Sequence, residues 1–119
     1  MKPFITTFIL FTVFTIQVSA QEIYSKAYGN PENDVVIFLH GGPGYNSSSF
    51  EFTTAQTLAE SGFYVITYDR RGEGRSLDNK AKFTFEETFK DLNEIYKKYG
   101  IKEATLLGHS FGGIVGTFF

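Results

Sequence analysis

Three short, mainly apolar runs dominate the pattern of polar and hydrophobic positions along this chain. They cover residues 35–39, 63–68 and 104–107, and the first, Val35-Val36-Ile37-Phe38-Leu39, contains no polar residue at all. A strand that is apolar on both faces belongs in the middle of a sheet covered on both sides, as in parallel α/β proteins. Residues 22–28 alternate loosely and predict a fourth, weaker strand.

Helical patterns separate these runs. A short helix is predicted from Thr53 or Thr54 to Glu60. A longer one follows Thr84, the N-cap of a capping box that Glu87 completes. It ends at Gly100, and its apolar side chains are three and four positions apart: Phe85, Phe89, Leu92, Ile95, Tyr96 and Tyr99. The alternation of strands and helices predicts an α/β fold with a doubly wound parallel sheet and right-handed crossovers.

The first 20 residues have the pattern of a secretory signal peptide. Lys2 supplies the positive charge, Phe4 to Val18 are mainly apolar, and Val18-Ser19-Ala20 places small residues where a signal peptidase cleaves. We therefore predict a signal peptide over residues 1–20 and export to a bacterial periplasm or to the exterior. An uncleaved anchor helix is the alternative, because the apolar stretch approaches the length that spans a bilayer.

Composition narrows the classes of partner. The 119 residues carry a formal net charge of −2 and contain no cysteine. The charge gives no reason to expect nucleic acid or an anionic membrane surface as a partner, and we expect no stable membrane association once the signal is removed. The lack of cysteine excludes disulfides, thiolate metal sites and a cysteine nucleophile. No metal or other cofactor is expected.

Three glycine-rich loops each follow a predicted strand. They are His40-Gly41-Gly42-Pro43-Gly44, the segment from Asp69 to Ser76, and Gly108-His109-Ser110-Phe111-Gly112-Gly113. Sites in open parallel sheets form where the carboxyl ends of the strands meet, so these loops are expected to lie together. The third loop contains G-x-S-x-G, in which a serine sits on a sharp turn between a strand and a helix.

In these three segments the chain resembles the α/β-hydrolase superfamily, and within it the HGGPG-loop branch that includes prolyl iminopeptidases and related esterases. The first loop matches HGGPG, the second matches D-x-R-G-x-G-x-S, and the third matches the nucleophile elbow, in the family's order. The resemblance implies an α/β-hydrolase fold over residues 21–119, in an incomplete form that comprises the N-terminal half. Dehalogenases and epoxide hydrolases are disfavoured, because those relatives carry aspartate where Ser110 stands.

The resemblance also assigns chemistry to individual residues. Ser110 would attack an ester or amide carbonyl and form an acyl-enzyme. The backbone N–H of Phe111 and that of Gly42 would bind the oxyanion, with Gly41 as the second choice. We expect the other loop residues to shape the site without reacting: His40, Pro43, Asp69, Arg71, Gly108 and Gly112.

Some side chains in and near these loops have less specific roles. Asp69 and Arg71 are expected to form an ion pair that holds their own loop. His109 is expected to pack beside the elbow, and neither it nor His40 suits the general base. Tyr45 and Phe50 line an acyl pocket in one interpretation and are surface aromatics in the other.

In this superfamily the catalytic acid and histidine follow the nucleophile along the chain, and no candidate for either follows Ser110. We therefore expect a secreted serine hydrolase, peptidase or esterase, of which these residues are the N-terminal part and alone inactive. Its substrate would be a small molecule or a peptide. A non-catalytic relative that uses the fold for binding is the alternative.

Overall fold

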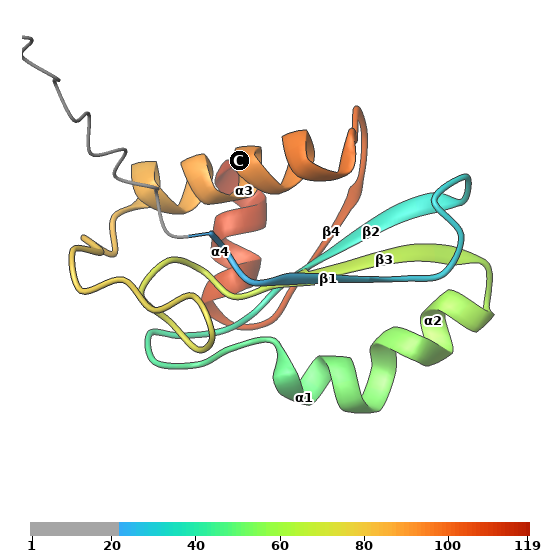
Figure 1. Cartoon of the computed structure of the whole chain (residues 1–119), viewed down its shortest axis with the longest axis horizontal. Helices are drawn as coiled ribbons and strands as arrows, with labels where there is room; N and C mark the ends of the chain where they lie inside the picture. The colour runs from blue at the N-terminus through green and yellow to red at the C-terminus, as the bar shows by residue number, and fades with distance from the viewer. Residues whose placement is uncertain (1–21) are drawn as a thin grey trace, which may run out of the picture.

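The computed structural model describes residues 22–119 and contains a four-stranded sheet between helices (Figure 1). The predicted signal peptide over residues 1–20 lies outside the described residues. The elements follow one another as β1 (Ser25–Tyr28), β2 (Asp34–Leu39), α1 (Ser48–Phe50), η1 (Glu51–Ala55), α2 (Gln56–Glu60), β3 (Phe63–Tyr68), α3 (Phe85–Tyr99), β4 (Thr105–Gly108) and α4 (Phe111–Phe118). The predicted strands over 35–39, 63–68 and 104–107 are confirmed, the last one shifted by one residue.

The strand order is β1-β3-β2-β4, with β2 parallel to both β3 and β4. Val36 of β2 lies opposite Val65 on one side and Thr105 on the other. The predicted parallel sheet is confirmed for these three strands, whereas β1 pairs with β3 in the antiparallel direction and makes the sheet mixed at this edge. The reason is the turn over residues 29–33, which is too short for the crossover that a parallel connection needs.

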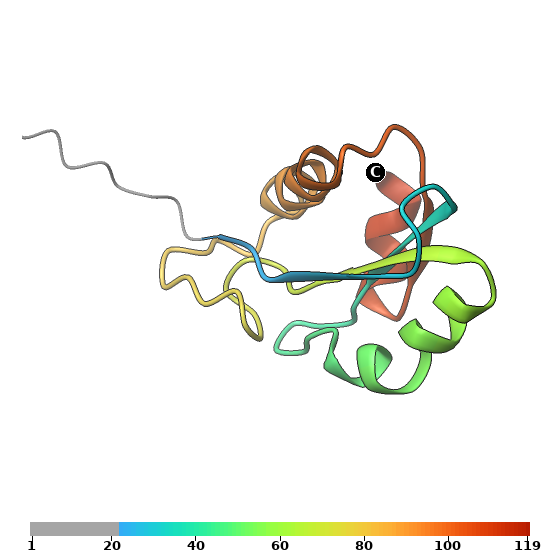
Figure 2. The ribbon, with the colours of Figure 1, turned by 45° about the vertical axis from the view of Figure 1, so that its right-hand side comes forward.

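Helices cover both faces of the sheet, α3 and α4 on one and the α1–α2 segment on the other (Figures 1 and 2). Successive side chains of β2 point to opposite faces of the sheet and therefore pack against different helices. Ile37 and Leu39 join a buried core with Leu92 and Ile95 of α3 and Val115 of α4. On the opposite face the rings of Phe38 and Phe50 stack with their centroids 3.9 Å apart.

The helical segment before β3 begins earlier than predicted. It runs from Ser48 to Glu60 through the π-helical turn η1, whereas the sequence predicts a start at residue 53 or 54. The side chain of Asn46 starts it by accepting a hydrogen bond from the Ser48 N–H at 2.9 Å. Serine is a weak helix former, which is why residues 47–49 resemble a loop in the sequence.

Helix α3 has the predicted ends. The Thr84 hydroxyl accepts from the Glu87 N–H at 3.2 Å, and Gly100 closes the helix in the left-handed conformation with φ 65°. The prediction that Glu87 completes the capping box is wrong. Its carboxylate accepts from the N–H groups of Lys82 and Phe83, not from that of Thr84.

Helix α4 packs against α3 through aromatic rings. Phe119 lies 5.8 Å from Phe89 and 5.9 Å from Tyr96 between ring centroids, and Phe118 lies 6.4 Å from Phe85. These contacts cover the two rings only in part, since Phe118 is 71% exposed and Phe119 44%. Within residues 22–119, every helix is too short or too polar to span a membrane.

Candidate active site

Ser110 occupies a sharp turn between β4 and α4. Its backbone has a positive φ, with φ 53° and ψ −121°, and it immediately precedes the first residue of the helix. A Cβ on Gly108 would lie 2.5 Å from the Cα of Gly113, and one on Gly112 would overlap the carbonyl of Leu39. The turn therefore closes only because these two positions lack side chains, which is the physical basis of the G-x-S-x-G pattern.

In the part of the chain that the structure describes, the amino end of α4 offers an unpaired donor, the N–H of Phe111, next to Ser110. The N–H groups of Gly112 and Gly113 bond to the carbonyls of His109 and Ser110, both at 2.9 Å, whereas within the described residues the Phe111 N–H donates no hydrogen bond. The N–H groups of Gly41 and Gly42 are likewise unpaired within that part of the chain, so this lack of partners alone does not separate the first choice from the second. The exposed side chain of Ser110 lies at the start of this helix, where its dipole favours negative charge.

The glycine loop lies directly beside this turn. A Cβ on Gly41 would be 3.0 Å from Nδ1 of His109 and 3.4 Å from the Cβ of Ser110. The backbone also links the two loops, because the His109 N–H donates to the Leu39 carbonyl at 3.0 Å. The structure thus brings together the first and third glycine-rich loops, as the sequence predicts.

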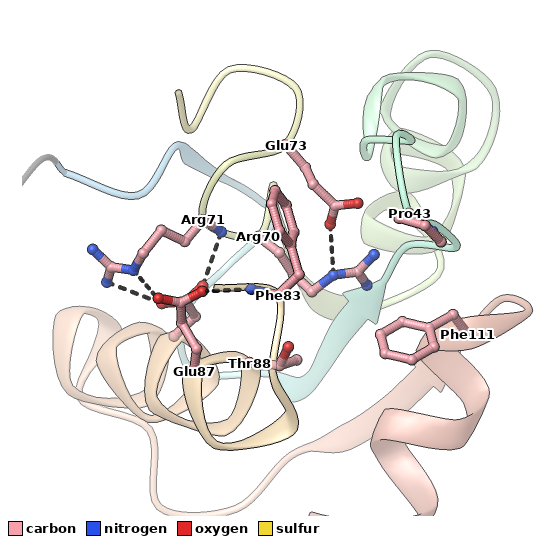
Figure 3. Close-up of a pocket in the computed structure, with 9 residues that line it drawn as sticks. Pro43, Arg70, Arg71, Glu73, Phe83, Glu87, Thr88 and Phe111 are labelled. Atoms are coloured by element: carbon pink, nitrogen blue, oxygen red, sulfur yellow. Dashed lines mark hydrogen bonds and ion pairs between the residues drawn. The ribbon is translucent and has the colours of Figure 1, made fainter. Parts of the chain in front are cut away.

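Arg70 and Glu73 join the second loop to the first, and neither residue is among those that the sequence predicts for the site. The Arg70 guanidinium donates to the His40 carbonyl from Nη1 at 2.6 Å and to the Gly41 carbonyl from Nη2 at 2.7 Å. Its Nε donates to Glu73 at 2.8 Å, and the other Glu73 oxygen accepts from the Gly44 N–H at 2.7 Å. Figure 3 shows the guanidinium between Glu73 and the ring of Phe111, 5.0 Å from that ring's centroid.

His40 is buried under the glycine loop. Its Nε2 accepts from the Arg70 N–H at 3.0 Å, so its Nδ1 carries the proton and donates to the Gly41 carbonyl at 2.6 Å. Burial and the nearby Arg70 charge lower the pKa of His40, which favours this neutral tautomer. Within residues 22–119, no hydrogen bond joins Ser110 to either imidazole. Both ring nitrogens of His40 have other partners, and His109 lies exposed beside the elbow.

The predicted ion pair between Asp69 and Arg71 is wrong. Asp69 instead accepts from Arg75, whose Nε lies 2.8 Å from Oδ2. Arg71 points away from the loop and pairs with Asp91 of α3 at 2.9 Å. Arg71 and Arg75 thus pair with different helical segments, α3 and η1, which a pairing by sequence proximity does not foresee.

A buried polar cluster surrounds Asp69. Its second oxygen accepts from the backbone and the hydroxyl of Ser47, at 2.8 and 2.7 Å, and Arg75 continues to Glu51 at 2.9 Å. Burial raises the pKa of Asp69, but the hydrogen bonds from Arg75 and Ser47 outweigh it and lower the pKa to about 2. Glu51 was missed because a lone acidic residue next to a serine-rich loop gives no signal of burial.

Two hollows flank the glycine loop. One, of about 160 Å³, is bounded by Pro43, Phe83 and Phe111, with Arg70, Arg71, Glu73, Glu87, Thr88 and Asp91 at its polar margin (Figure 3). The other, of about 270 Å³, lies beside Gly41 and His109 and includes both Tyr45 and Phe50. Tyr45 is 67% exposed, whereas Phe50 is packed on Phe38, so both interpretations of these aromatics remain predictions. Residues 22–119 contain no group of side chains suited to hold a metal ion.

Comparison with known proteins decides the family. The sequence profile of the alpha/beta hydrolase fold family matches residues 34–119. The chain belongs to this family. The resemblance to the branch with proline iminopeptidases is also confirmed: a proline iminopeptidase from Clostridioides difficile strain 630 is 38% identical over 81 residues, which are 66% of this chain and 27% of that protein.

The fold of this chain also matches solved structures of other proteins. A proline iminopeptidase-related protein from Thermus thermophilus superposes with a TM-score of 0.72 at 30% identity, covering 87% of this chain and 37% of that one. A structure from a study of carboxylesterases of Nitrososphaera gargenis gives a TM-score of 0.73 at 25% identity, covering 87% and 38%. The chain spans about a third of the length of the curated relatives that it matches.

Proposed function

We propose that this α/β hydrolase is a serine hydrolase that cleaves ester or amide bonds, N-terminal peptide bonds among them, through an acyl-enzyme on Ser110. The observation that carries the proposal is the backbone of Ser110, which holds a non-glycine residue at φ 53° on a strand-to-helix turn. Such strain costs about 1–3 kcal/mol and is kept where it serves a site. Here it exposes a hydroxyl at a helix start.

The surroundings of Ser110 support acyl transfer. The unpaired N–H of Phe111 adjoins the serine, and the unpaired N–H groups of Gly41 and Gly42 belong to the loop in contact with it. Two such donors stabilise the oxyanion of a tetrahedral intermediate, and each is worth about 3 kcal/mol in serine hydrolases. The absence of side chains on the loop leaves room for a carbonyl against the backbone.

A general base is still needed, because a serine hydroxyl is a weak nucleophile at neutral pH. Both histidines of this chain are accounted for: His40 is buried in the contact with Arg70, and His109 makes no hydrogen bond to Ser110 within the described residues. We propose that a longer chain supplies the acid and the histidine, and that residues 22–119 alone lack hydrolase activity. A binding role without catalysis is favoured only if no such base exists.

Substitution of Ser110 tests this proposal. In the full-length enzyme, Ser110→Ala is expected to abolish labelling by a fluorophosphonate and to lower ester or aminopeptidase turnover by at least about 10⁴-fold, as loss of the nucleophile does elsewhere. Ser61→Ala is the matched control, because this exposed serine ends α2 far along the chain from the elbow. The proposal fails if Ser110→Ala keeps labelling and turnover while remaining folded.

We also propose that the protein is exported with residues 1–20 as its signal peptide. The support is the sequence pattern of Lys2, the apolar stretch and Val18-Ser19-Ala20. N-terminal sequencing of the secreted product is expected to begin at Gln21. A product that keeps residues 1–20 in a membrane fraction would instead indicate an anchor.

A further inference from the structure

Arg70 is unusual among the arginines of the loop that follows β3. Arg71 pairs with Asp91 of α3, and Arg75 pairs with Glu51 of η1, so each of these two ties the loop to a helix. Arg70 contacts no helix through a hydrogen bond within the described residues. Its guanidinium bonds there only to the carbonyls of the glycine loop and to Glu73 of its own loop.

The hydrogen bonds of Arg70 to the glycine loop bury its positive charge. The residue is 5% exposed, as is Glu73, and the pair buries both charges with an Nε to Oε2 distance of 2.8 Å. Desolvating an ion pair costs about as much as the pair gains, so a buried pair contributes little net stability. A pair of this kind is better explained by the groups that it orients than by the stability that it adds.

The oriented group is the peptide unit between Gly41 and Gly42. The Gly41 carbonyl accepts from Nη2 of Arg70 at 2.7 Å and from Nδ1 of His40 at 2.6 Å, so two donors fix the direction of this carbonyl. In a trans peptide the C=O and N–H bonds point in opposite directions. The Gly42 N–H is therefore held pointing away from Arg70, and it donates no hydrogen bond within residues 22–119.

The same guanidinium also contacts the other proposed donor residue. It lies 5.0 Å from the ring centroid of Phe111, close enough for a cation–π interaction that fixes the first residue of α4. Donation to the Gly41 carbonyl further polarises that peptide and strengthens its N–H as a donor. One side chain thus contacts both the Gly41–Gly42 peptide and the ring of Phe111, the two residues that carry the proposed oxyanion donors being Gly42 and Phe111.

We propose that Arg70 is a positioning residue that orients and polarises the oxyanion donors of Gly42 and Phe111. The inference rests on the proposed function, since it assumes that an oxyanion forms at Ser110. It predicts an effect on the transition state and not on the binding of uncharged substrate. Glu73 assists by fixing the guanidinium and by accepting the Gly44 N–H.

The test compares Arg70→Met with Arg75→Met in the full-length enzyme. Both remove a guanidinium from the same loop, but Arg75 contacts the Asp69 cluster and not the glycine loop. Active sites are titrated with a fluorophosphonate, so that kcat is expressed per reactive serine and loss of folded protein is removed from the comparison. Inhibition by a boronic acid, whose tetrahedral adduct resembles the intermediate, provides a second readout.

Arg70→Met is expected to lower kcat per active site by about 10- to 100-fold with KM changed less than about threefold, because donors are displaced but not deleted. Boronate inhibition is expected to weaken by a similar factor, and Arg70→Lys to recover part of both losses. Arg75→Met is expected to reduce the number of active sites with kcat per site within about twofold of wild type.

Two results would overturn the inference: an unchanged kcat per site in Arg70→Met, or an equal loss in Arg75→Met. Ser110→Ala is assayed in parallel to separate this failure from that of the proposed function. If Ser110→Ala keeps its turnover, the proposed function fails and the inference with it. If only Ser110→Ala loses turnover, the function stands and Arg70 has a purely structural role.

Discussion

At the scale of single residues, the elbow depends on two glycines whose neighbours leave no room for a side chain. Gly112 packs its Cα against the carbonyl of Leu39, and Gly108 packs against Gly113. These contacts hold β4 and α4 close enough to keep Ser110 at its positive φ. The third glycine of the loop is different, because a Cβ on Gly113 would meet nothing closer than the Gly108 carbonyl at 3.8 Å.

This difference predicts opposite effects of the same substitution at adjacent positions. Gly112→Ala is expected to lower the free energy of unfolding by about 2 kcal/mol or more, because the added methyl overlaps fixed backbone. Gly113→Ala is expected to be neutral or to stabilise by up to about 1 kcal/mol, because alanine is the better helix former. Urea unfolding of the two variants measures both, and equal effects would contradict the packing described for the elbow.

Individual residues were predicted well where a motif fixes the backbone and poorly where a charge chooses its partner. The glycines around Ser110 follow from the sterics of a strand-to-helix turn, which the sequence displays. The partner of Asp69 does not, because Arg70, Arg71 and Arg75 are all near it in sequence and the path of the loop selects Arg75. Burial of Glu51 and Glu73 is likewise a property of packing between distant segments.

At the scale of elements, the loop after β3 is fastened to η1 by the cluster of Asp69, Arg75, Glu51 and Ser47. Within this cluster the Asp69 side chain is fully buried, with 0% exposure. Within the described residues, the Asp69 carboxylate accepts five hydrogen bonds, all of them from Ser47 and Arg75. The ionised carboxylate is therefore much better stabilised in the folded protein than in the unfolded chain.

The lowered pKa of Asp69, from 3.8 to about 2, makes this contribution dependent on pH. A carboxyl group with a depressed folded-state pKa stabilises the fold above its unfolded pKa, and the contribution is lost as the pH falls from about 4 through 2. Since one pKa unit corresponds to about 1.36 kcal/mol, the contribution is roughly 2 kcal/mol.

Asp69→Asn is expected to lose this stability at neutral pH. The difference in unfolding free energy between wild type and variant is expected to shrink between about pH 4 and pH 2, measured by denaturant unfolding at each pH. Taking the difference removes the contributions of His40 and Asp91, which titrate in both proteins. A difference that stays constant across this range would contradict the assignment of Asp69.

Elements were predictable in proportion to how strongly one pattern marks them. The strands β2 and β3 are apolar on both faces, and the apolar spacing of α3 with its end at Gly100 leaves little choice of boundary. The direction of β1 depends on the length of a turn and on which neighbour it pairs with, and neither is visible in the four residues of the strand. The early start of the α1–α2 segment depends on hydrogen bonds from the backbone N–H and the hydroxyl of Ser48 to the side-chain oxygen of Asn46.

At the scale of the whole molecule, the elbow lies where an exposed sheet edge meets an incompletely covered helix. Among the described strands β4 is an edge strand, and Leu107, Ile114 and Phe118 are 40%, 48% and 71% exposed. Open edges and apolar surfaces of this kind promote association between chains. Together with the coverage of about a third of each matched relative, this surface is consistent with the proposal that a longer chain completes the site.

The most direct test of the central claim is to locate a fluorophosphonate adduct by mass spectrometry in the full-length enzyme. Trypsin cleaves after Lys102, so the peptide that starts at Glu103 contains Ser110 as the first serine. We expect a single adduct on this peptide at Ser110, formed in proportion to the loss of turnover. An adduct on any other serine, or full loss of turnover with Ser110 unmodified, would contradict it.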